Sequence, residues 1–577
     1  MFAKLLLSQL FLCCLNAQVS LQPSTPSPVP VGTIVAWTAN ATGAGAGTLW
    51  YRFRARRIGQ NFRTIIDYGP KNSFEWTATE HEGNYEVEAS VRNLDTGATV
   101  AVKAQFEMLS NVTGRVPVVN ATAHPLVFLY SAPPCGAESR MRVRFETAGG
   151  KPQFTPYKPC DPGSSMNFYL AGMHPQTHYR ASYILDTGSA IHEGPSVSFT
   201  TGKETIVPAS QTVIQAEDSD GILLQSTIVK NVIATDLSGN LLWYYAKPVM
   251  LMTEAERDGF FWAIVGGPVF GAPPGGLDRE TITEFDLVGT TVTETNVARV
   301  NEQLTSMGKS PITGFHHEVS RLPDGKILVL CSEERILADV QGPGPVDIIG
   351  DAVIVLNQNL QVVWVWDAFE HLDVKRKAVL GETCVSCASL AKVANDWTHM
   401  NSVQQTPDGN LLLSSRSQDW IYKIDYENGN GDGHVIWRLG KGGDFQLNSS
   451  DPMDWFSHQH DARYTSDRDS TITVYDDGNT RQASDPKAHS RGQALRIDEK
   501  NMTAELILNA DLGVFSSALG SAQKVANGHY YFCSGFLSDN TSFTTEVDPF
   551  ARIVYELHVG AQQYRAFRMR DVYTPGR

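Results

Sequence analysis

Three histidines lie seven to nine residues ahead of an aspartate that begins a predicted turn. The pairs are His317 with Asp324, His399 with Asp408, and His460 with Asp467. Equivalent spacing to a hairpin turn predicts that each histidine begins a strand that the turn ends. Grouped imidazoles can attack as nucleophiles, move protons and bind anions. If the three strands are equivalent units of a repeat, the sequence predicts one shared site.

Arg416 adds a permanent cation to this site. It follows the Asp408-Gly409 turn by about the distance at which His399 precedes it, so pairing across the hairpin brings the two together. A single histidine is most often a structural or surface residue. Three at matched positions, with an arginine beside one of them, predict an anion site.

A metal site is the competing interpretation. His458 and His460 are two residues apart, so they would share one strand face, and histidine is a common metal ligand. No nearby carboxylate or cysteine completes a convincing ligand set, and Arg416 would repel a cation. We therefore expect no metal and no cofactor.

The strands that must position these residues are predicted in the region from about residue 205 to the C-terminus. Hairpin signals recur there between apolar runs, at Leu237-Ser-Gly-Asn240, Pro323-Asp-Gly-Lys326, Pro407-Asp-Gly-Asn410 and Ala526-Asn-Gly-His529. Four-stranded units of ~40–60 residues would divide this region into about six, which predicts a six-bladed β-propeller at 205–577. The inner strands of a propeller converge on one channel, as the histidines require. A long array of β-sandwiches is the alternative.

Two smaller modules precede the repeat. Short alternating runs such as Leu49-Trp-Tyr-Arg-Phe predict an Ig-like β-sandwich at 18–112. A second sandwich, resembling fibronectin type III, is predicted at 113–204 from runs such as Thr177-His-Tyr-Arg-Ala-Ser-Tyr. The expected fold class is therefore all-β, with two sandwich modules followed by the propeller.

The first residues predict secretion. Lys4 precedes an apolar run from Leu5 to Leu15, and Ala17 supplies a small residue for cleavage, so 1–17 is predicted to be a signal peptide. A membrane anchor would need ~20 apolar residues, and the run is shorter. No later stretch predicts stable membrane insertion. We expect a secreted, extracellular protein.

Cysteines and glycosylation motifs agree with that route. Of eight cysteines, two lie in the predicted signal peptide, which leaves an even number. Cys135 pairs with Cys160 in our prediction, because both fall in the second module. Cys384 and Cys387 are predicted to form a local disulfide, with half a zinc site or a redox pair as alternatives. The pairing of Cys331 and Cys533 stays open. Asn-X-Ser/Thr motifs occur at Asn40, Asn111, Asn120, Asn448, Asn501 and Asn540.

Composition limits the partners. Hydrophobic residues make up 42% and charged residues 19%, which is typical of a globular chain. The formal net charge of −15 offers no basic field for phosphodiesters, so nucleic acid is not an expected partner. A local cationic site remains compatible with this charge.

In combination, five segments resemble the arylsulfotransferase (arylsulfate sulfotransferase) family over residues 205–560. They are Phe315-His-His-Glu-Val, Asp396-Trp-Thr-His-Met-Asn-Ser402, Ser414-Ser-Arg416, Ser457-His-Gln-His-Asp-Ala462 and Tyr475-Asp-Asp-Gly-Asn479. The resemblance implies a six-bladed propeller that moves sulfuryl groups from aryl sulfate esters to phenols without a phosphoadenosine donor. It also implies that small-molecule aryl sulfates and phenols are the partners.

The resemblance implies a role for each matched residue. His460 matches the histidine that becomes sulfated, His399 and Arg416 match ligands of the sulfuryl oxygens, and His317 matches a further active-site histidine. His316 competes for that last role. Further candidates for substrate binding or support are His316, Asn401, Tyr475 and Arg491, together with Asp396 and Asp461.

The residues support the same chemistry independently. A sulfuryl group in transfer spreads negative charge over its oxygens, and one arginine with flanking histidines offers the donors it needs. Attack by a neutral imidazole would split the transfer into two displacements, which predicts ping-pong kinetics. The alternative function is a secreted propeller that binds an anionic ligand or partner without turnover.

Overall fold

A computed structural model describes residues 18–43, 46–217, 220–228, 231–266, 276–449, 451–465 and 470–575. The predicted signal peptide at 1–17 and Asp467 lie outside the described residues. Within them the chain forms 45 strands and only three α-helices, so the prediction of a mostly β protein is confirmed.

The first module is a sandwich of two sheets with an aromatic core. One sheet has the order β1-β3-β6, and the other has the order β2-β8-β7-β4-β5. Between them Trp37 packs edge-on against Phe106, with ring centroids 5.3 Å apart. The strands are β1 (Gln18–Pro23), β2 (Val29–Pro30), β3 (Val35–Thr42), β4 (Leu49–Arg57), β5 (Arg63–Gly69), β6 (Ser73–Trp76), β7 (Gly83–Asn93) and β8 (Thr99–Leu109).

The second module also pairs two sheets, and a disulfide joins parts of it. One sheet has the order β14-β10-β9, and the other centres on β11 and β15. Cys135 and Cys160 are bonded, with Cα atoms 5.3 Å apart, as predicted. The strands are β9 (Val118–Ala121), β10 (Phe128–Ala132), β11 (Arg140–Glu146), β12 (Gln153–Phe154), β13 (Lys158–Pro159), β14 (Met166–Leu170), β15 (His178–Asp186), β16 (Ile191–Glu193) and β17 (Val197–Thr200).

Six groups of four antiparallel strands follow. The C-terminal strand β45 (Gln563–Met569) completes the first group by pairing with β19. The groups are β19 (Ile222–Thr227), β20 (Val232–Asp236) and β21 (Leu241–Tyr244) with β45; β22 (Leu251–Ala255), β23 (Phe260–Val265), β24 (Thr281–Asp286) and β25 (Thr291–Asn296); β26 (Gly314–Arg321), β27 (Ile327–Ala338), β28 (Pro345–Leu356) and β29 (Val362–Asp367); β32 (Met400–Gln405), β33 (Leu411–Ser415), β34 (Trp420–Ile424) and β35 (Val435–Leu439); β37 (His460–Tyr464), β38 (Thr471–Asp476), β39 (Arg491–Asp498) and β40 (Thr503–Asp511); and β41 (Gly520–Lys524), β42 (Tyr530–Ser534), β43 (Ser542–Val547) and β44 (Ile553–Val559).

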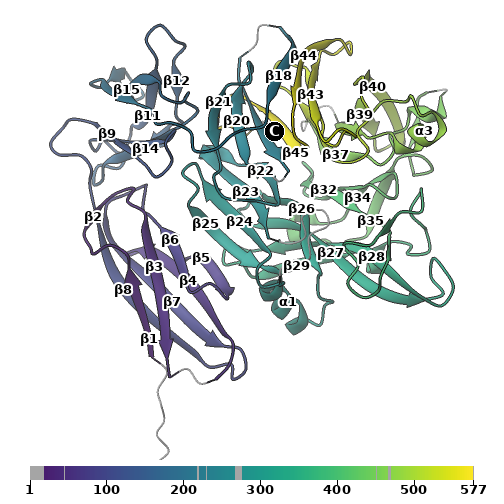
Figure 1. Ribbon diagram of the computed structural model, residues 1–577, viewed down its shortest axis with the longest axis horizontal. Coiled ribbons are helices and arrows are strands. Elements are labelled where there is room, and N and C mark those ends of the chain that lie inside the picture. The colour runs from purple at the N-terminus through teal and green to yellow at the C-terminus, as the bar shows by residue number, and fades with distance from the viewer. Residues whose placement is uncertain are drawn as a thin grey trace, which may run out of the picture.

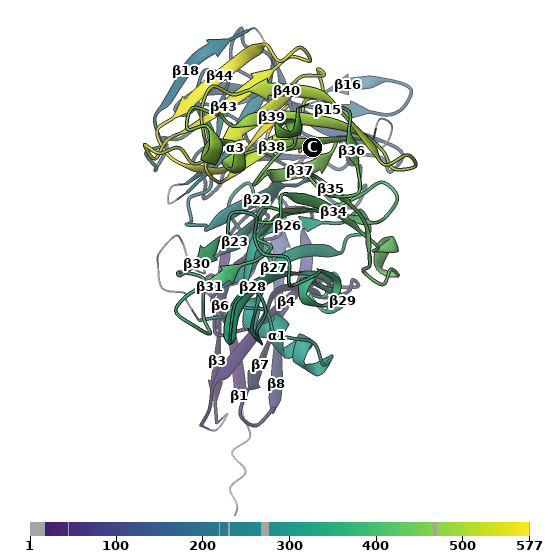
Figure 2. The same cartoon turned by 90° about the vertical axis from the view of Figure 1, so that its right-hand side faces the viewer.

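Short elements decorate these groups. Strand β18 (Gln211–Ala216) pairs with β44, and β36 (Gln446–Leu447) pairs with β40. Figure 2 shows β30 (Thr383–Cys384) and β31 (Ala394–Asp396) beside β28, where β31 pairs with β28. The helices are α1 (Val297–Ser306), α2 (Ala368–His371) and α3 (Asn479–Ser484), with single 3-10 turns at Arg257–Gly259, Glu427–Gly429 and Pro452–Asp454.

The predicted hairpin turns are present. The turns at Asp324 and Asp408 connect β26 to β27 and β32 to β33, and their glycines, Gly325 and Gly409, have φ of 83° and 86°. This left-handed conformation is the one that glycine adopts most readily. The two turns therefore end strands that begin near the histidines, as the spacing predicted.

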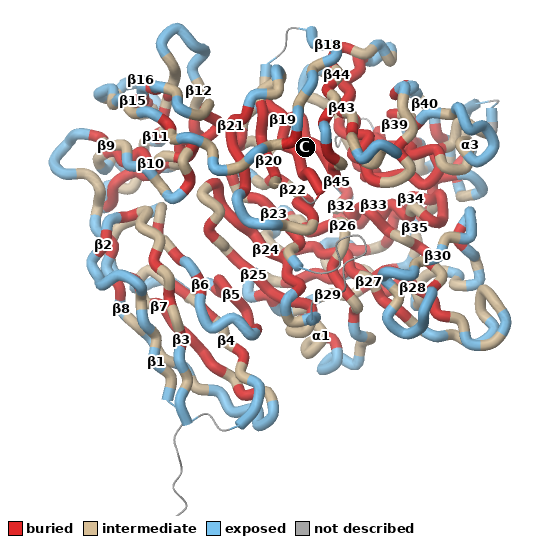
Figure 3. Tube along the Cα trace, in the orientation of Figure 1, coloured by how far each residue is buried: buried red, intermediate tan, exposed pale blue. Residues whose placement is uncertain are grey.

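One strand from each group lies beside the corresponding strand of the next. Strand β22 neighbours β26, β26 neighbours β32, β32 neighbours β37, β37 neighbours β41, and β41 neighbours β45. In Figure 1 the groups follow one another around a common centre near β26, β32 and β37. Figure 3 shows that buried residues predominate along these central strands, whereas the peripheral loops are exposed. Residues at the starts of β26, β32 and β37 therefore face a shared centre.

The first module joins the second group through an extended sheet. Strand β5 lies parallel to β25, with Ile66 opposite Glu294, so one nine-stranded sheet runs through both. Lys71 Nζ lies 2.7 Å from a Glu294 carboxylate oxygen at this junction. None of the helices in the described ranges has the length and apolar character needed to cross a bilayer.

The remaining cysteines behave in two ways. Cys384 and Cys387 are bonded to each other, which favours the predicted local disulfide over the zinc alternative. Cys331 and Cys533 are buried free thiols, and burial raises the pKa of both. The pairing that the sequence left open therefore does not occur between these two.

Candidate active site

Irregular backbone aims the histidines toward the centre. His317 and His399 have φ of 58° and 43°, and Asp461, directly after His460, has φ of 53°. Left-handed φ is uncommon for residues with a Cβ, and such strain collects at functional sites. The pairing register also shifts at each place, in β26, β32 and β37. Bulges of this kind redirect side chains, so the local backbone turns the imidazoles out of the normal strand alternation.

The structure brings the three predicted histidines together. The ring centroid of His317 lies 5.3 Å from that of His399 and 6.5 Å from that of His460. The residues come from three different four-stranded groups. We refer to His317, His399, His460 and Arg416 as the histidine cluster.

His460 is held in one tautomer. Its Nδ1 lies 2.7 Å from an Asp477 carboxylate oxygen, and the backbone N–H of Leu519 donates to its Nε2 at 3.3 Å. Because Nε2 accepts this bond, Nδ1 carries the proton and donates it to Asp477. Burial, with Arg416 and His399 nearby, holds the pKa of His460 well below its usual value. The imidazole is therefore neutral, with its lone pair on Nε2.

His399 also has a carboxylate partner but remains partly exposed. Its Nδ1 lies 2.6 Å from an Asp396 oxygen, and 31% of its side chain is accessible. Burial acts to raise the pKa of Asp396, but His399 and Arg416 outweigh it, so the pKa is lowered. Asp396 is therefore an ionised carboxylate that accepts a hydrogen bond from the Nδ1–H of His399.

Arg416 presents unpaired donors. Its backbone N–H donates to the His399 carbonyl at 3.1 Å, as pairing across the hairpin predicted. One guanidinium nitrogen, Nη2, donates to the Ser517 carbonyl at 3.2 Å, whereas the buried Nε has no hydrogen-bond partner among the described residues. Within the same residues no carboxylate lies within 4.0 Å of the guanidinium. A half-buried cation without an anionic partner is a ready site for an anion.

His316 and His317 form a linked pair. Their Nδ1 atoms are 2.8 Å apart, and Nε2 of His316 lies 2.9 Å from an Asp351 oxygen. The carbonyl of His317 accepts a hydrogen bond from the hydroxyl of Tyr564. Burial, with His316 and His399 next in effect, lowers the pKa of His317 well below its usual value. His317 is therefore a neutral group in the centre, and His316 links it to Asp351.

A fully buried charge network lies under the cluster. Arg565 reaches both Glu318 and Asp461, at 3.0 and 3.6 Å, and Arg463 reaches the same two carboxylates, at 2.6 and 3.0 Å. Glu318 and Asp461 directly follow His317 and His460 in the sequence. Because breaking one member of a buried ion network leaves an uncompensated charge, the network fixes the backbone that carries the histidines.

The other predicted substrate-binding residues are placed differently. Asn401 donates to the Gln459 carbonyl at 2.7 Å and accepts from the Asp461 N–H at 3.2 Å, so it braces the strand of His460. Tyr475 is fully buried, and its hydroxyl donates to Ser534 at 2.9 Å. Arg491 pairs with Asp476 at 2.9 Å and donates to backbone carbonyls of Met453–Trp455. The structure brings none of the three into hydrogen-bond contact with the histidine cluster.

Two important contacts were not predicted from the sequence. Asp477, the partner of His460, lies in the segment Tyr475–Asn479, in which the sequence predicted a site role only for Tyr475. His458 is fully buried between Glu382, to which it is hydrogen-bonded, and Asp419, 2.9 Å away. Burial alone would lower its pKa, but Asp419 and Glu382 raise it overall. His458 and His460 therefore have separate carboxylate partners instead of the shared ligand position that the metal alternative required.

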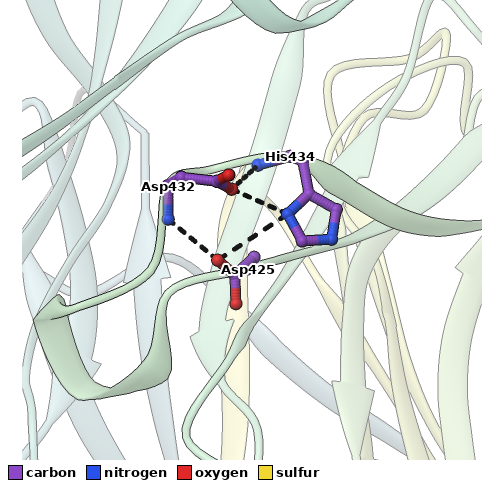
Figure 4. A group of neighbouring side chains, drawn as sticks. All are labelled: Asp425, Asp432 and His434. Carbon is purple, nitrogen blue, oxygen red and sulfur yellow. Dashed lines mark hydrogen bonds and ion pairs between the residues drawn. The ribbon is translucent and has the colours of Figure 1, made fainter.

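One group in the described residues has the donor atoms for a metal ion, and it lies elsewhere. Asp425, Asp432 and His434 meet on the turn between β34 and β35, as Figure 4 shows, with ligand atoms within 4.8 Å of one another. His434 Nδ1 lies 2.7 Å from an Asp432 oxygen. Hydrogen bonds of this kind explain the grouping without an ion, and Asp432 and His434 are exposed.

The cluster as a whole suits transfer of an anionic group. It joins a neutral imidazole whose Nε2 carries the lone pair, a second imidazole paired with a carboxylate, and a guanidinium with unpaired donors. A nucleophile, a proton donor and a site for developing negative charge are the parts that such a transfer needs.

Comparison with known proteins gives one informative match. A family model described as Arylsulfotransferase (ASST) matches residues 197–567. No curated protein matches the sequence significantly. Among solved structures, the chicken interferon gamma receptor alpha chain is 9% identical, with 31% of this chain and 98% of that chain covered and a TM-score of 0.13. A two-domain fibronectin type III segment of chicken tenascin is 15% identical, with 32% and 98% covered and a TM-score of 0.15. Scores this low do not establish a shared fold.

Proposed function

The chain belongs to the arylsulfotransferase family, and from this premise we propose that it moves a sulfuryl group from an aryl sulfate ester to a phenol. The proposed transfer proceeds through a covalent intermediate on His460 and uses no phosphoadenosine donor. The observation that carries the proposal is the state of His460. Its neutral ring and fixed tautomer put the lone pair on Nε2, near the unpaired donors of Arg416. The lone pair accepts a long hydrogen bond of 3.3 Å from the Leu519 N–H, which attack on sulfur would replace.

The first displacement sulfates His460. Its Nε2 attacks the sulfur, an N–S bond forms, and the S–O bond to the aryl oxygen breaks. The imidazole gains positive charge while its Nδ1–H donates to Asp477. Burial raises the pKa of the Asp477 carboxyl well above its usual value, and the positive ring beside it favours the ionised form. Arg416 donates to the sulfuryl oxygens as charge spreads over them. His399, held by Asp396 through Nδ1, acts as the general acid that gives a proton to the departing phenolate.

The second displacement reverses the proton flow. The acceptor phenol gives its proton to His399, its oxygen attacks the sulfur, and the N–S bond breaks. His460 returns to its neutral form and the new aryl sulfate leaves. Because the first phenol leaves and the covalent intermediate forms before the acceptor reacts, the kinetics are ping-pong. His317, neutral and central, lines the site opposite His399.

We also propose that the six four-stranded groups are the blades of one propeller. Support comes from the way β22, β26, β32, β37, β41 and β45 neighbour one another in succession. Pairing of β45 with β19 would then close the ring, because it joins the two ends of the repeat region.

Secretion and glycosylation belong to the same proposal. The disulfides at Cys135–Cys160 and Cys384–Cys387 suit an oxidising compartment. The asparagines of the glycosylation motifs are exposed except Asn111, whose amide donates to the Val31 carbonyl at 2.9 Å. Mass spectrometry of secreted protein, before and after glycosidase treatment, should show a mature start near Gln18 and attached glycans. Retention of residues 1–17 would contradict this.

Turnover with a chromogenic substrate tests the proposed activity. 4-Nitrophenyl sulfate with a phenol as acceptor should release 4-nitrophenol and form the sulfated acceptor in equal amounts. Absence of product across several aryl sulfates and phenols would favour the alternative, a protein that binds an anion without turnover.

A further inference from the structure

His458 is a buried histidine to which the proposed reaction gives no role. Its side chain has no exposed surface, and it lies two residues before His460. We propose that His458 is a positioning residue: with Glu382 and Asp419 it forms a clamp that holds the chain segments of the histidine cluster together. The inference rests on the proposed function, because the clamp serves the same site.

Both ring nitrogens of His458 face carboxylates. Nε2 is hydrogen-bonded to an oxygen of Glu382, and Nδ1 lies 2.9 Å from an oxygen of Asp419. Burial acts to raise the pKa of Glu382, but the hydrogen bond with His458 outweighs it and lowers the pKa. An ionised carboxylate only accepts hydrogen bonds, so a ring nitrogen this close to one is stable only with a proton. The clamp therefore holds His458 as an imidazolium.

Glu382 connects the clamp to His399. Its backbone carbonyl accepts a hydrogen bond from the N–H of Asp396 at 3.1 Å, and the Asp396 side chain contacts Nδ1 of His399 at 2.6 Å. The second carboxylate oxygen of Glu382 accepts the N–H of Leu380 at 3.1 Å, which fixes the orientation of the side chain. Release of Glu382 from His458 would therefore loosen the segment that positions Asp396.

Asp419 connects the clamp to Arg416 and His460. It lies three residues after Arg416, and the oxygen that faces the His458 ring also accepts the backbone N–H of His458 at 2.7 Å. Asp419 and His458 have φ of 53° and 54°, a conformation that residues with a Cβ adopt at a cost. Surrounding contacts must outweigh this cost, and the ion pair between the two side chains is one of them.

The charge of His458 depends on its neighbours. The charged groups that act on it are Asp419 before β34, Glu382 before β30, and Arg416 after β33, whose positive charge opposes its own. Burial alone would lower the pKa of His458, but the two carboxylates raise it overall. The clamp is therefore complete while His458 is protonated, and it is lost as the pH rises through this raised pKa.

Hydrogen exchange tests the clamp without any substrate. At about pH 6, below the ordinary pKa of histidine, His458 of the wild type is protonated. In His458→Gln, peptides that cover residues 379–397 should exchange at least ~10-fold faster than in wild type, because the charge that holds Glu382 is gone. His434→Gln is the matched control and should leave this exchange unchanged. That histidine also faces two carboxylates, at 2.7 and 3.7 Å, but 63% of its side chain is exposed.

The pH profile of turnover tests the link to the reaction. In wild type, kcat should fall on the alkaline side as His458 loses its proton. Glu382→Gln removes one of the two carboxylates that hold this proton, so the fall should begin ~1 pH unit lower or more. His434→Gln should keep the wild-type profile. A residue that served the fold alone would lower kcat without shifting the profile.

Two results would overturn the clamp. One is unchanged exchange of residues 379–397 in both His458→Gln and Glu382→Gln, and the other is an alkaline fall at the same pH in wild type and Glu382→Gln. If His458→Gln misfolds, Glu382→Gln decides both measurements, because it keeps the shape of a side chain that is 17% exposed. Exchange needs no turnover. A wild type without sulfuryl transfer would therefore count against the proposed function, whereas faster exchange in the variants would still support the clamp.

Discussion

An Asp477 carboxylate oxygen accepts the Nδ1 proton of His460 at 2.7 Å, and both side chains are almost completely buried. His460 begins β37, and Asp477 directly follows the adjacent strand β38, which ends at Asp476. With the Leu519 N–H directed at Nε2, this contact decides which nitrogen can attack.

Asp477→Asn should therefore damage the reaction more than the fold. An asparagine amide that donates to Nδ1 would move the proton to Nε2, where it blocks the lone pair and faces the Leu519 N–H. We expect the rate of the sulfation step to fall by a factor on the order of 10²–10⁴, with little change in KM. Rapid mixing with 4-nitrophenyl sulfate measures that step.

An exposed histidine–aspartate pair provides the control. His489 Nδ1 lies 2.9 Å from an Asp511 oxygen, outside the cluster. Asp511→Asn should leave the sulfation rate unchanged. A similar loss in both variants, or none in Asp477→Asn, would show that tautomer control by Asp477 is not needed.

Arg416→Gln should reduce kcat/KM by a factor on the order of 10²–10³, as expected for loss of a donor to developing charge. The unfolding midpoint should change little, because Arg416 has one hydrogen bond from its side chain and no ion pair among the described residues. Arg496→Gln removes an exposed arginine paired with Glu505 and should retain full activity. A normal kcat/KM in Arg416→Gln would show that the guanidinium does not stabilise the transition state.

A buried histidine outside the histidine cluster makes stability depend on pH. His124 precedes β10 and contacts β21: the Leu126 N–H donates to its Nδ1 at 3.1 Å, so Nε2–H donates to the Tyr244 carbonyl at 2.9 Å. Burial lowers its pKa from 6.5 to about 4. Below pH 6.5 His124 is protonated in the unfolded chain but stays neutral in the folded protein. The free energy of unfolding therefore falls as the pH falls toward 4.

His124→Gln keeps a donor for the Tyr244 carbonyl and removes the titration. The pKa shift corresponds to about 3 kcal/mol at pH 4, so the variant should lose that much less stability than wild type between pH 7 and 4. Urea unfolding of both proteins measures the difference. His178→Gln, at an exposed site, should follow the wild-type pH dependence. Parallel curves for wild type and His124→Gln would contradict the assignment.

The sequence predicted the convergence of His317, His399 and His460 because hairpin turns mark where strands end. Such turns depend on local residue types. The Asp-Gly pairs that end in Gly325 and Gly409 predict a hairpin turn, and both glycines adopt the left-handed conformation that it needs. The spacing of His317 and His399 from their turns then places them three residues into β26 and directly before β32, without knowledge of the rest of the fold. The turn expected at Asp467, after His460, lies outside the described residues.

Side-chain direction was harder to predict. Tyr475 lies directly opposite His460 in the strand pairing, yet its hydroxyl contacts Ser534 in the next group. The register shift between His460 and Arg463 breaks the simple alternation that a sequence pattern assumes. Contacts between groups far apart in sequence, such as His458 with Glu382, have no local signal at all.

The most direct measurement of the central claim is a rapid-mixing experiment with an aryl sulfate and no acceptor. If His460 is the nucleophile, about one phenol per enzyme should be released as a burst. Digestion of the protein after the burst should then yield a peptide that contains sulfated His460. His460→Asn should abolish both the burst and the modification. A burst that persists in His460→Asn, or a sulfated peptide that contains His399 or His317 instead, would contradict the account.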